Sequence, residues 1–141
     1  MPRKMRSLGL TVFCCIVLSM GLLHAPTSSD AFEITIQVSP STLNIGSDGE
    51  VVTVHTDIAY KIVVGASVYL NGVPISWWKA DNQGNFVAKF DMIEVEELAA
   101  SGGLEVPGEN ELTLVGFTND GVEFTGTETI TVINVQPSGR K

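Results

Sequence analysis

Hydrophobic and polar residues alternate along several short segments of the chain between residues 32 and 135. A period of two is typical of a β-strand with one face in the core. Segments with this pattern, or a shorter version of it, are residues 32–38, 50–58, 66–70, 73–79, 85–90, 111–118 and 122–135. Gly126 predicts a break in the last and longest segment. We therefore expect seven or eight short strands.

Turn-forming residues separate these segments. Asn71-Gly72 favours a type I′ hairpin turn, and Asn-Asp-Gly at 119–121 is a second hairpin signal. Pro74 indicates that 73–79 is an edge strand. Residues 91–103 look helical, with a short helical turn near 91–100 that would bring Ile93 and Leu98 to the core.

Short strands with frequent turn signals predict an all-β fold, an antiparallel β-sandwich. A small closed barrel is the alternative. Within the sandwich, residues 66–70, 111–118 and 128–135 are expected in one sheet, with 73–78 beside them. The inward set is then Val68, Leu70, Leu112, Leu114, Ile130 and Val132.

The first 31 residues have the features of a secretory signal peptide. Positive residues at 3–6 precede an apolar run at 8–23, and small residues follow, so cleavage is expected after Ala31 or Ala25. A retained membrane anchor is the alternative, but the run of 16 residues is shorter than the roughly 20 needed to span a bilayer. The mature chain would contain no transmembrane segment and would be exported: periplasmic, cell-surface or extracellular.

Cys14 and Cys15 suggest lipidation as a minor alternative, but both lie in the middle of the apolar run and Phe13 precedes them. Both would leave with the signal peptide, so the mature domain would fold without disulfides. Residues 32–136 then form one domain, and 137–141 form a flexible tail.

The charge balance restricts the class of partner. The chain has 8 basic and 16 acidic residues; without Arg3, Lys4, Arg6 and Asp30, 5 and 15 are left, a net charge of −10. Such a surface repels phosphate backbones, which excludes nucleic acid as the partner. It disfavours anionic membrane surfaces for the same reason.

Four stretches carry a resemblance to a known class of module: "VSPSTLNIGSDGEVVTVHTDI", "SVYLNGVPI", "KADNQGNFVAKF" and "NELTLVGFTNDGVEFTGTETITVI". Together they cover most of residues 36–133, and they resemble the immunoglobulin-like modules of secreted and surface proteins from bacteria and archaea. The resemblance implies an immunoglobulin-like antiparallel β-sandwich. It also implies a role as a spacer, stalk or binding appendage.

The sequence predicts no enzyme. Thr53, His55 and Asp57 lie on one strand face, but alternate residues are about 7 Å apart with parallel side chains, so they cannot converge as a catalytic triad. The glutamates of 94–97 and 105–111 are expected to be a solvated acidic surface, not a glycosidase pair. One mature-chain histidine without cysteine cannot supply a zinc site. No cofactor is expected.

Residues 81–85 offer two candidate calcium ligands, Asp81 and Asn85. An EF-hand loop starting at Asp81 would need glycine at position 86 and glutamate at position 92, where Phe86 and Met92 stand. A tight turn explains the Asp, Asn and Gly residues more simply. Further oxygens could come from Asp48, Asp120 and Glu123 in other loops.

An apolar outer face is the strongest candidate for a binding surface. Trp77 and Trp78 are adjacent on a strand and point to opposite faces, so one can join the core. Exposed apolar patches usually mark interaction surfaces, although the 91–103 segment could instead cover this one. The candidate binding residues are Tyr69, Trp77, Trp78, Val115, Phe117 and Ile133.

We therefore expect an exported, non-catalytic binding or structural module acting through protein–protein contacts. One alternative is a calcium-stabilised carbohydrate-binding module that uses Trp77 or Trp78 as a stacking platform. A hydrolase, or an inhibitor of one, is the other. The sequence identifies neither the partner nor the oligomeric state.

Overall fold

The computed structural model describes residues 31–49, 51–136 and 138. The predicted signal peptide, apart from Ala31, and most of the predicted tail lie outside the described residues. The elements are β1 (Phe32–Glu33), β2 (Ile36–Ser39), β3 (Thr42–Asn44), β4 (Val51–Ala59), the 3-10 helix η1 (Tyr60–Ile62), β5 (Val63–Leu70), β6 (Val73–Pro74), β7 (Trp77–Ala80), β8 (Asn85–Asp91), α1 (Met92–Ala100), β9 (Gly108–Thr118) and β10 (Glu123–Ile133).

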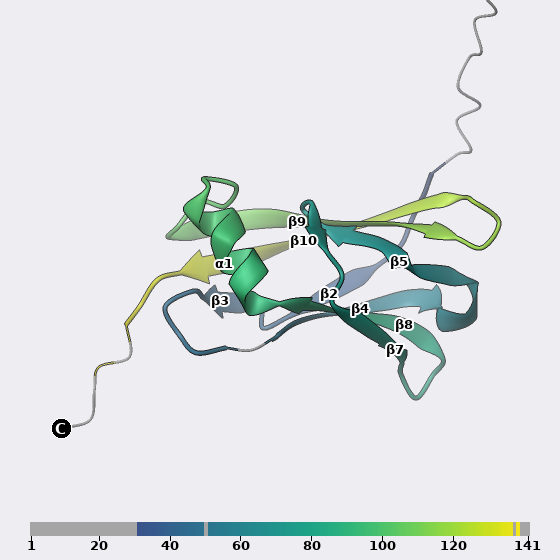
Figure 1. Ribbon diagram of the computed structural model, residues 1–141, viewed down its shortest axis with the longest axis horizontal. Helices are drawn as coiled ribbons and strands as arrows, with labels where there is room; N and C mark the ends of the chain where they lie inside the picture. Colours follow the sequence, from purple (N-terminus) through teal and green to yellow (C-terminus); the bar gives the residue numbers. More distant parts are fainter. Residues whose placement is uncertain (1–30, 50, 137, 139–141) are drawn as a thin grey trace, which may run out of the picture.

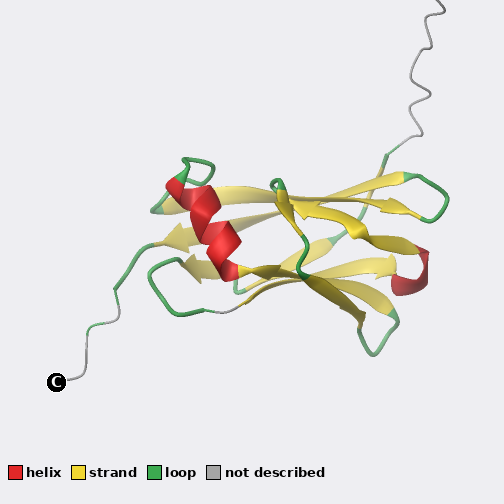
Figure 2. Cartoon of the chain, in the orientation of Figure 1, coloured by secondary structure: helices red, strands yellow, loops and turns green. Residues whose placement is uncertain are grey.

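The strands form two sheets that face each other (Figure 1). Sheet A has the order β1-β10-β9-β5-β6, with β3 also paired to β10, and sheet B has the order β2-β4-β8-β7. Pairing is antiparallel except that β1 and β3 run parallel to β10. Figure 2 shows α1 at one end, where it leads from sheet B to sheet A. The all-β prediction is confirmed, and two separate sheets replace the alternative of a closed barrel.

Alternating residues from both sheets build the core, as the sequence pattern predicts. All six residues of the predicted inward set of sheet A are buried. From sheet B they meet Val52 and Val54 of β4 and Phe86 and Phe90 of β8. Apolar side chains therefore fill the space between the sheets and hold them together by their burial.

Residues 32–38 do not form the single strand that their alternation predicts. β1 belongs to sheet A and β2 to sheet B, and the chain crosses between the sheets at Ile34 and Thr35. Gly126, where we predicted a break, lies inside an unbroken β10. A Cβ on Gly126 would lie 2.6 Å from Ile36 Cγ2, so this glycine lets the crossing segment approach the strand closely.

Residues 73–79 are also divided between the two sheets, so the prediction of one edge strand beside sheet A is wrong for β7. β6, with Pro74, is the edge of sheet A. The N–H of Ile75 still donates to Val68 O (3.1 Å), but that of Ser76 donates to Lys89 O (2.9 Å) in sheet B. The chain therefore changes sheets within one residue.

The predicted helix is present as α1, but one of its expected core contacts is wrong. The Asp91 carboxylate caps the helix by accepting the N–H of Ile93 at 2.9 Å. Met92 and Val95 are buried and Leu98 packs against the core, whereas Ile93 is 63% exposed. Because Met92 and Val95 are three residues apart, they share one helix face, and Ile93 lies about 100° away from Met92.

Both hairpin predictions are confirmed. Asn71 and Gly72 have φ values of 46° and 83°, the left-handed pair that a type I′ turn requires. The Asn71 side chain ties this turn to β9 because its Oδ1 accepts the N–H of Thr113 at 2.7 Å. Residues 119–121 join β9 to β10, which pair antiparallel along their whole length.

Candidate functional site

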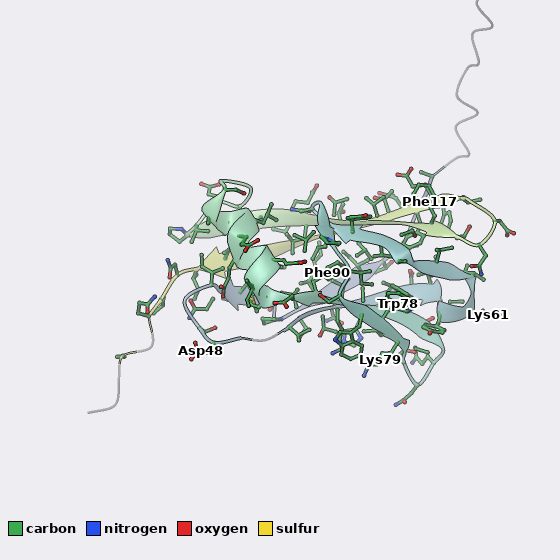
Figure 3. All side chains as sticks on the ribbon, in the orientation of Figure 1. Asp48, Lys61, Trp78, Lys79, Phe90 and Phe117 are labelled. Atoms are coloured by element: carbon green, nitrogen blue, oxygen red, sulfur yellow. The ribbon has the colours of Figure 1, made fainter. Side chains whose placement is uncertain are left out.

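The outer face of sheet A carries an apolar patch of four side chains: Val64, Tyr69, Val115 and Phe117. Tyr69 lies opposite Val115, and Val64 lies opposite Phe117. Val64, Tyr69 and Phe117 are 40%, 46% and 41% exposed. Figure 3 shows Phe117 on the outer side of its sheet, away from the core. Three of the predicted binding residues, Tyr69, Val115 and Phe117, therefore lie together, and α1 leaves them exposed.

An irregularity in β5 fixes the geometry of this patch. The register between β5 and β9 shifts between Val64 and Tyr69. The hydroxyl of Ser67 fills the gap because it accepts the N–H of Phe117 at 2.9 Å and donates to Val64 O at 2.6 Å. Val64 and Tyr69 are five residues apart on β5, whereas their partners Phe117 and Val115 are two residues apart on β9, so β5 has three extra residues here. Ser67 thus holds the backbone of two patch residues in place.

Ile133 lies on the outer side of β10, as predicted, but far from the patch. It pairs with Asn44 of β3 at the opposite end of the sheet from Phe117. It is half-buried and lines a hollow with Ile45, Ala99 and Val106. Ile133 therefore does not contribute to the same surface as Phe117.

The adjacent tryptophans point to opposite faces, as the strand period requires. Trp78 lies opposite the buried Ala88, and its indole packs on Gly65: a Cβ there would be 2.1 Å from Trp78 Cε2. Figure 3 shows Trp78 between the two sheets. Trp78 is 38% exposed, so it lies at the margin of the core, where it covers the side of the sandwich between β5 and β7.

Trp77 belongs to a second surface, on the outer face of sheet B, which we call the lysine face: His55, Trp77, Lys79, Val87 and Lys89. Trp77 lies opposite Lys89, whose Nζ is 4.8 Å from the indole centroid, a cation–π contact. Lys89 Nζ also donates to Thr53 Oγ1 at 3.2 Å. Figure 3 shows Lys79 pointing away from the sheet. Val87 is fully buried beneath these longer side chains.

Sequence reasoning missed the lysine face, although the hairpin contains its signal. Lys79 and Val87 are paired, as are Trp77 and Lys89, because β7 and β8 are joined by a short turn. The position of that turn in the sequence determines which residues of β7 and β8 lie opposite each other, and it puts these four residues on the same face of the sheet. The burial of Val87 has no comparable signal, because it depends on neighbours from β4 and β7.

Thr53, His55 and Asp57 lie on one side of β4, as expected, and each has a separate environment. The Thr53 hydroxyl accepts from Lys89, and His55 is exposed. Asp57 Oδ1 accepts the N–H of Thr35 at 2.9 Å, at the point where the chain crosses between the sheets. Asp57 thus has a structural role in that crossing.

Residues 81–85 form the tight turn between β7 and β8. Asp81 Oδ1 accepts the N–H groups of Gln83 at 2.8 Å and Asn85 at 2.9 Å, and Gly84 has φ of 81°. The bond from Asn85 is the main cause that lowers the pKa of Asp81 below its usual value of 3.8. Among the described residues, no group of three or more His, Cys, Asp or Glu side chains is placed to hold a metal ion. Calcium at Asp81 and Asn85 stays an untested prediction.

Three hollows lie outside both faces. The hollow lined by Asn71, Glu94 and Ser101, between the β5–β6 turn and α1, measures about 470 Å³. The hollow beside Ile133 measures about 680 Å³, and one beside Tyr60 and Gln83 about 450 Å³. Within the described ranges, no helix is both long and apolar enough to cross a membrane.

Comparisons with protein-family models, with curated proteins and with solved structures find no match for this chain. Its function is therefore inferred from its surfaces.

Proposed function

We propose that this chain is a non-catalytic binding module that recognises a protein partner through the apolar patch. The observation that carries the proposal is the exposure of Val64, Tyr69 and Phe117, each at 40% or more, beside Val115. Folding does not require apolar residues on the outer face of a sheet, and contiguous exposed apolar side chains usually mark an interaction surface. Aromatic residues such as Tyr69 and Phe117 are also enriched in interfaces.

The scaffold in this proposal is an immunoglobulin-like sandwich. The order of sheet B, β2-β4-β8-β7, corresponds to strands A, B, E and D of that fold, and β10-β9-β5 corresponds to G, F and C. This correspondence supports the resemblance noted in the sequence. In such a scaffold the patch would lie on the outer face of the C, F and G strands.

The module would act outside the cytoplasm, at the cell surface or in the periplasm. The support for export is the sequence of residues 1–31. Because the remaining chain has a net charge of −10, the patch is an apolar area on a strongly acidic protein. Like-charge repulsion would disfavour the binding of acidic proteins, and this would make the module more selective for its partner.

Affinity capture from the envelope fraction of the source cells, followed by titration of the purified partner, tests this function. Phe117→Glu should raise the Kd at least about tenfold, because a charge would be desolvated in the interface. Thr127→Glu is the matched control, since Thr127 is exposed on the same outer face but outside the patch. Equal binding by wild type and Phe117→Glu would overturn the proposal, as would failure to capture any saturable partner.

A further inference from the structure

The lysine face differs in charge from the rest of this acidic protein. The described residues contain three lysines, Lys61, Lys79 and Lys89, and no arginine. Of the 16 acidic residues, Asp30 and Glu50 fall outside the described ranges, which leaves 14. Two of the three lysines nevertheless lie on neighbouring strands of the same face. This local concentration of positive charge attracts anions.

The strand register places an aromatic ring next to both charges: Trp77 is two residues from Lys79 on β7 and lies opposite Lys89 on β8. Lys79, Val87 and His55 form one row across β7, β8 and β4, and Trp77, Lys89 and Thr53 form the adjacent row. Neighbouring strands are about 4.8 Å apart, and rows about 7 Å apart. Trp77 is 46% exposed, and the Lys89 ammonium lies over its ring. The indole is therefore held in position and still offers surface to a ligand.

The carboxylates closest in sequence to this face are bound to backbone donors. Asp57 accepts the N–H of Thr35, and Asp91 accepts that of Ile93. Asp81 accepts two N–H groups in the β7–β8 turn. Asp91 ends β8 and Asp81 follows β7, whereas Asp57 lies within β4, beside His55. The part of the face formed by β7 and β8 therefore has lysine and tryptophan as its polar and aromatic groups.

We infer that the lysine face binds a carboxylated polysaccharide. An indole offers a flat apolar platform to the C–H side of a sugar ring, and lysine ammonium groups attract carboxylates as point charges. The three hollows described above lie elsewhere on the molecule. This inference does not rest on the apolar patch.

Titration with polygalacturonate, followed by calorimetry and tryptophan fluorescence, tests the inference on the mature chain. Binding should be saturable, should weaken as salt is added, and should be at least about tenfold weaker for fully methyl-esterified polygalacturonate, which lacks the charges. Equal affinity for the charged and the esterified polymer would overturn the role of the lysines. Absence of saturable binding to the charged polymer would overturn the inference as a whole.

Three variants distinguish a specific surface from general attraction. Lys79→Gln should weaken binding about threefold to tenfold, and Trp77→Ala about tenfold or more. Lys61→Gln makes the same charge change on η1, away from the face, and should have no effect. Lys79 is exposed, so its variant should fold normally. Equal losses at Lys61 and Lys79 would contradict the assignment.

Two further arms separate the proposals. Phe117→Glu should leave polygalacturonate binding unchanged, so that failure of one surface does not imply failure of the other. Polyglutamate of matched charge should bind more weakly than polygalacturonate because it offers no sugar ring to Trp77. Tighter binding of polyglutamate, with the same dependence on Lys79, would instead identify an acidic protein partner and overturn the polysaccharide class.

Discussion

The two sheets present inner faces of the same kind and outer faces of different kinds. Inside, both contribute tightly buried aliphatic and phenylalanine side chains. Outside, sheet A exposes Val64, Tyr69 and Phe117, whereas sheet B exposes Trp77 and Lys79, with Lys89 half-buried and Val87 buried. Folding constrains the inner faces because they must pack. Folding does not constrain the outer faces in this way, so the differences between them are the features from which we infer binding.

The largest expected effect contrasts an inner with an outer phenylalanine. Phe90 is fully buried, so Phe90→Ala should lower the free energy of unfolding by about 4 kcal/mol. Phe117→Ala should lower it by less than about 1 kcal/mol, because Phe117 already contacts water. Urea denaturation measures both values. Similar losses at the two positions would show that Phe117 belongs to the core and that sheet A has no free outer face.

A matched pair of valines compares the two outer faces directly. Val87→Ala should cost about 2 kcal/mol in unfolding free energy, since Val87 is fully buried beneath the lysine face. Val115→Ala should cost less than about 1 kcal/mol because Val115 is only half-buried. The same denaturation assay applies. The reverse order would mean that sheet A, not sheet B, has the packed outer face.

The packing of Trp78 on Gly65 can be tested by substitution at the side of the sandwich where β7 of sheet B lies next to β5 of sheet A. Gly65→Ala should destabilise the fold by about 1 kcal/mol, because the new methyl group must displace the indole. It should also shift the tryptophan emission to longer wavelength. In a Trp78→Ala background, the same substitution should cost almost nothing. An unchanged cost in that background would place the strain elsewhere.

The smallest expected effect concerns the turn that joins β7 and β8, two of the three strands of the lysine face. The backbone N–H groups that Asp81 accepts lower its pKa, so its stabilising effect is complete above its usual value of 3.8 and is lost as the pH falls through the folded-state pKa. Asp81→Asn should therefore lower the melting temperature at neutral pH. The difference from wild type should shrink in acid. A difference independent of pH would mean that the ionised carboxylate is not what stabilises the turn.

The calcium prediction has a direct measurement. If Asp81 and Asn85 were calcium ligands, excess calcium should raise the melting temperature relative to chelator. Asp81 Oδ1 already accepts two backbone N–H groups, so we expect the turn itself to account for both residues and the two melting temperatures to agree. A calcium-dependent increase that Asp81→Asn abolishes would contradict this.

The sequence predicted which residues point inward because a period of two applies to every strand, whichever sheet contains it. For the same reason it could not predict sheet membership. Residues 32–38 keep their alternation across a change of sheet. In residues 73–79 the alternation changes phase at the crossing, because Val73 and Ile75 face the core whereas Trp77 lies on the outer face of sheet B. Both changes of sheet depend on contacts with distant strands. Ile93 illustrates a different limit. Met92 and Val95 already attach the short helix α1 to the core, so the apolar Ile93 can lie on the exposed face of this helix.

The candidate surfaces show the same division. Tyr69, Val115 and Phe117 could be placed on one face because they lie on strands whose alternation is clear. The alternation places Ile133 on the same side of sheet A as these residues, but Ile133 lies at the opposite end of the sheet from Phe117. The short turn between β7 and β8 already implies that Lys79 lies opposite Val87 and that Trp77 lies opposite Lys89. The register shows that both lysines share a face with Trp77.

The parallel pairing of β1 and β3 with β10 has a consequence for synthesis. Val38, between those two strands, donates its N–H to the carboxylate of Glu128, 90 positions later. Because a ribosome makes the N-terminal strands first, β1 and β3 have no partner until β10 has emerged. The earliest strands of this domain are thus the ones that must wait longest, and closing so long a loop slows folding.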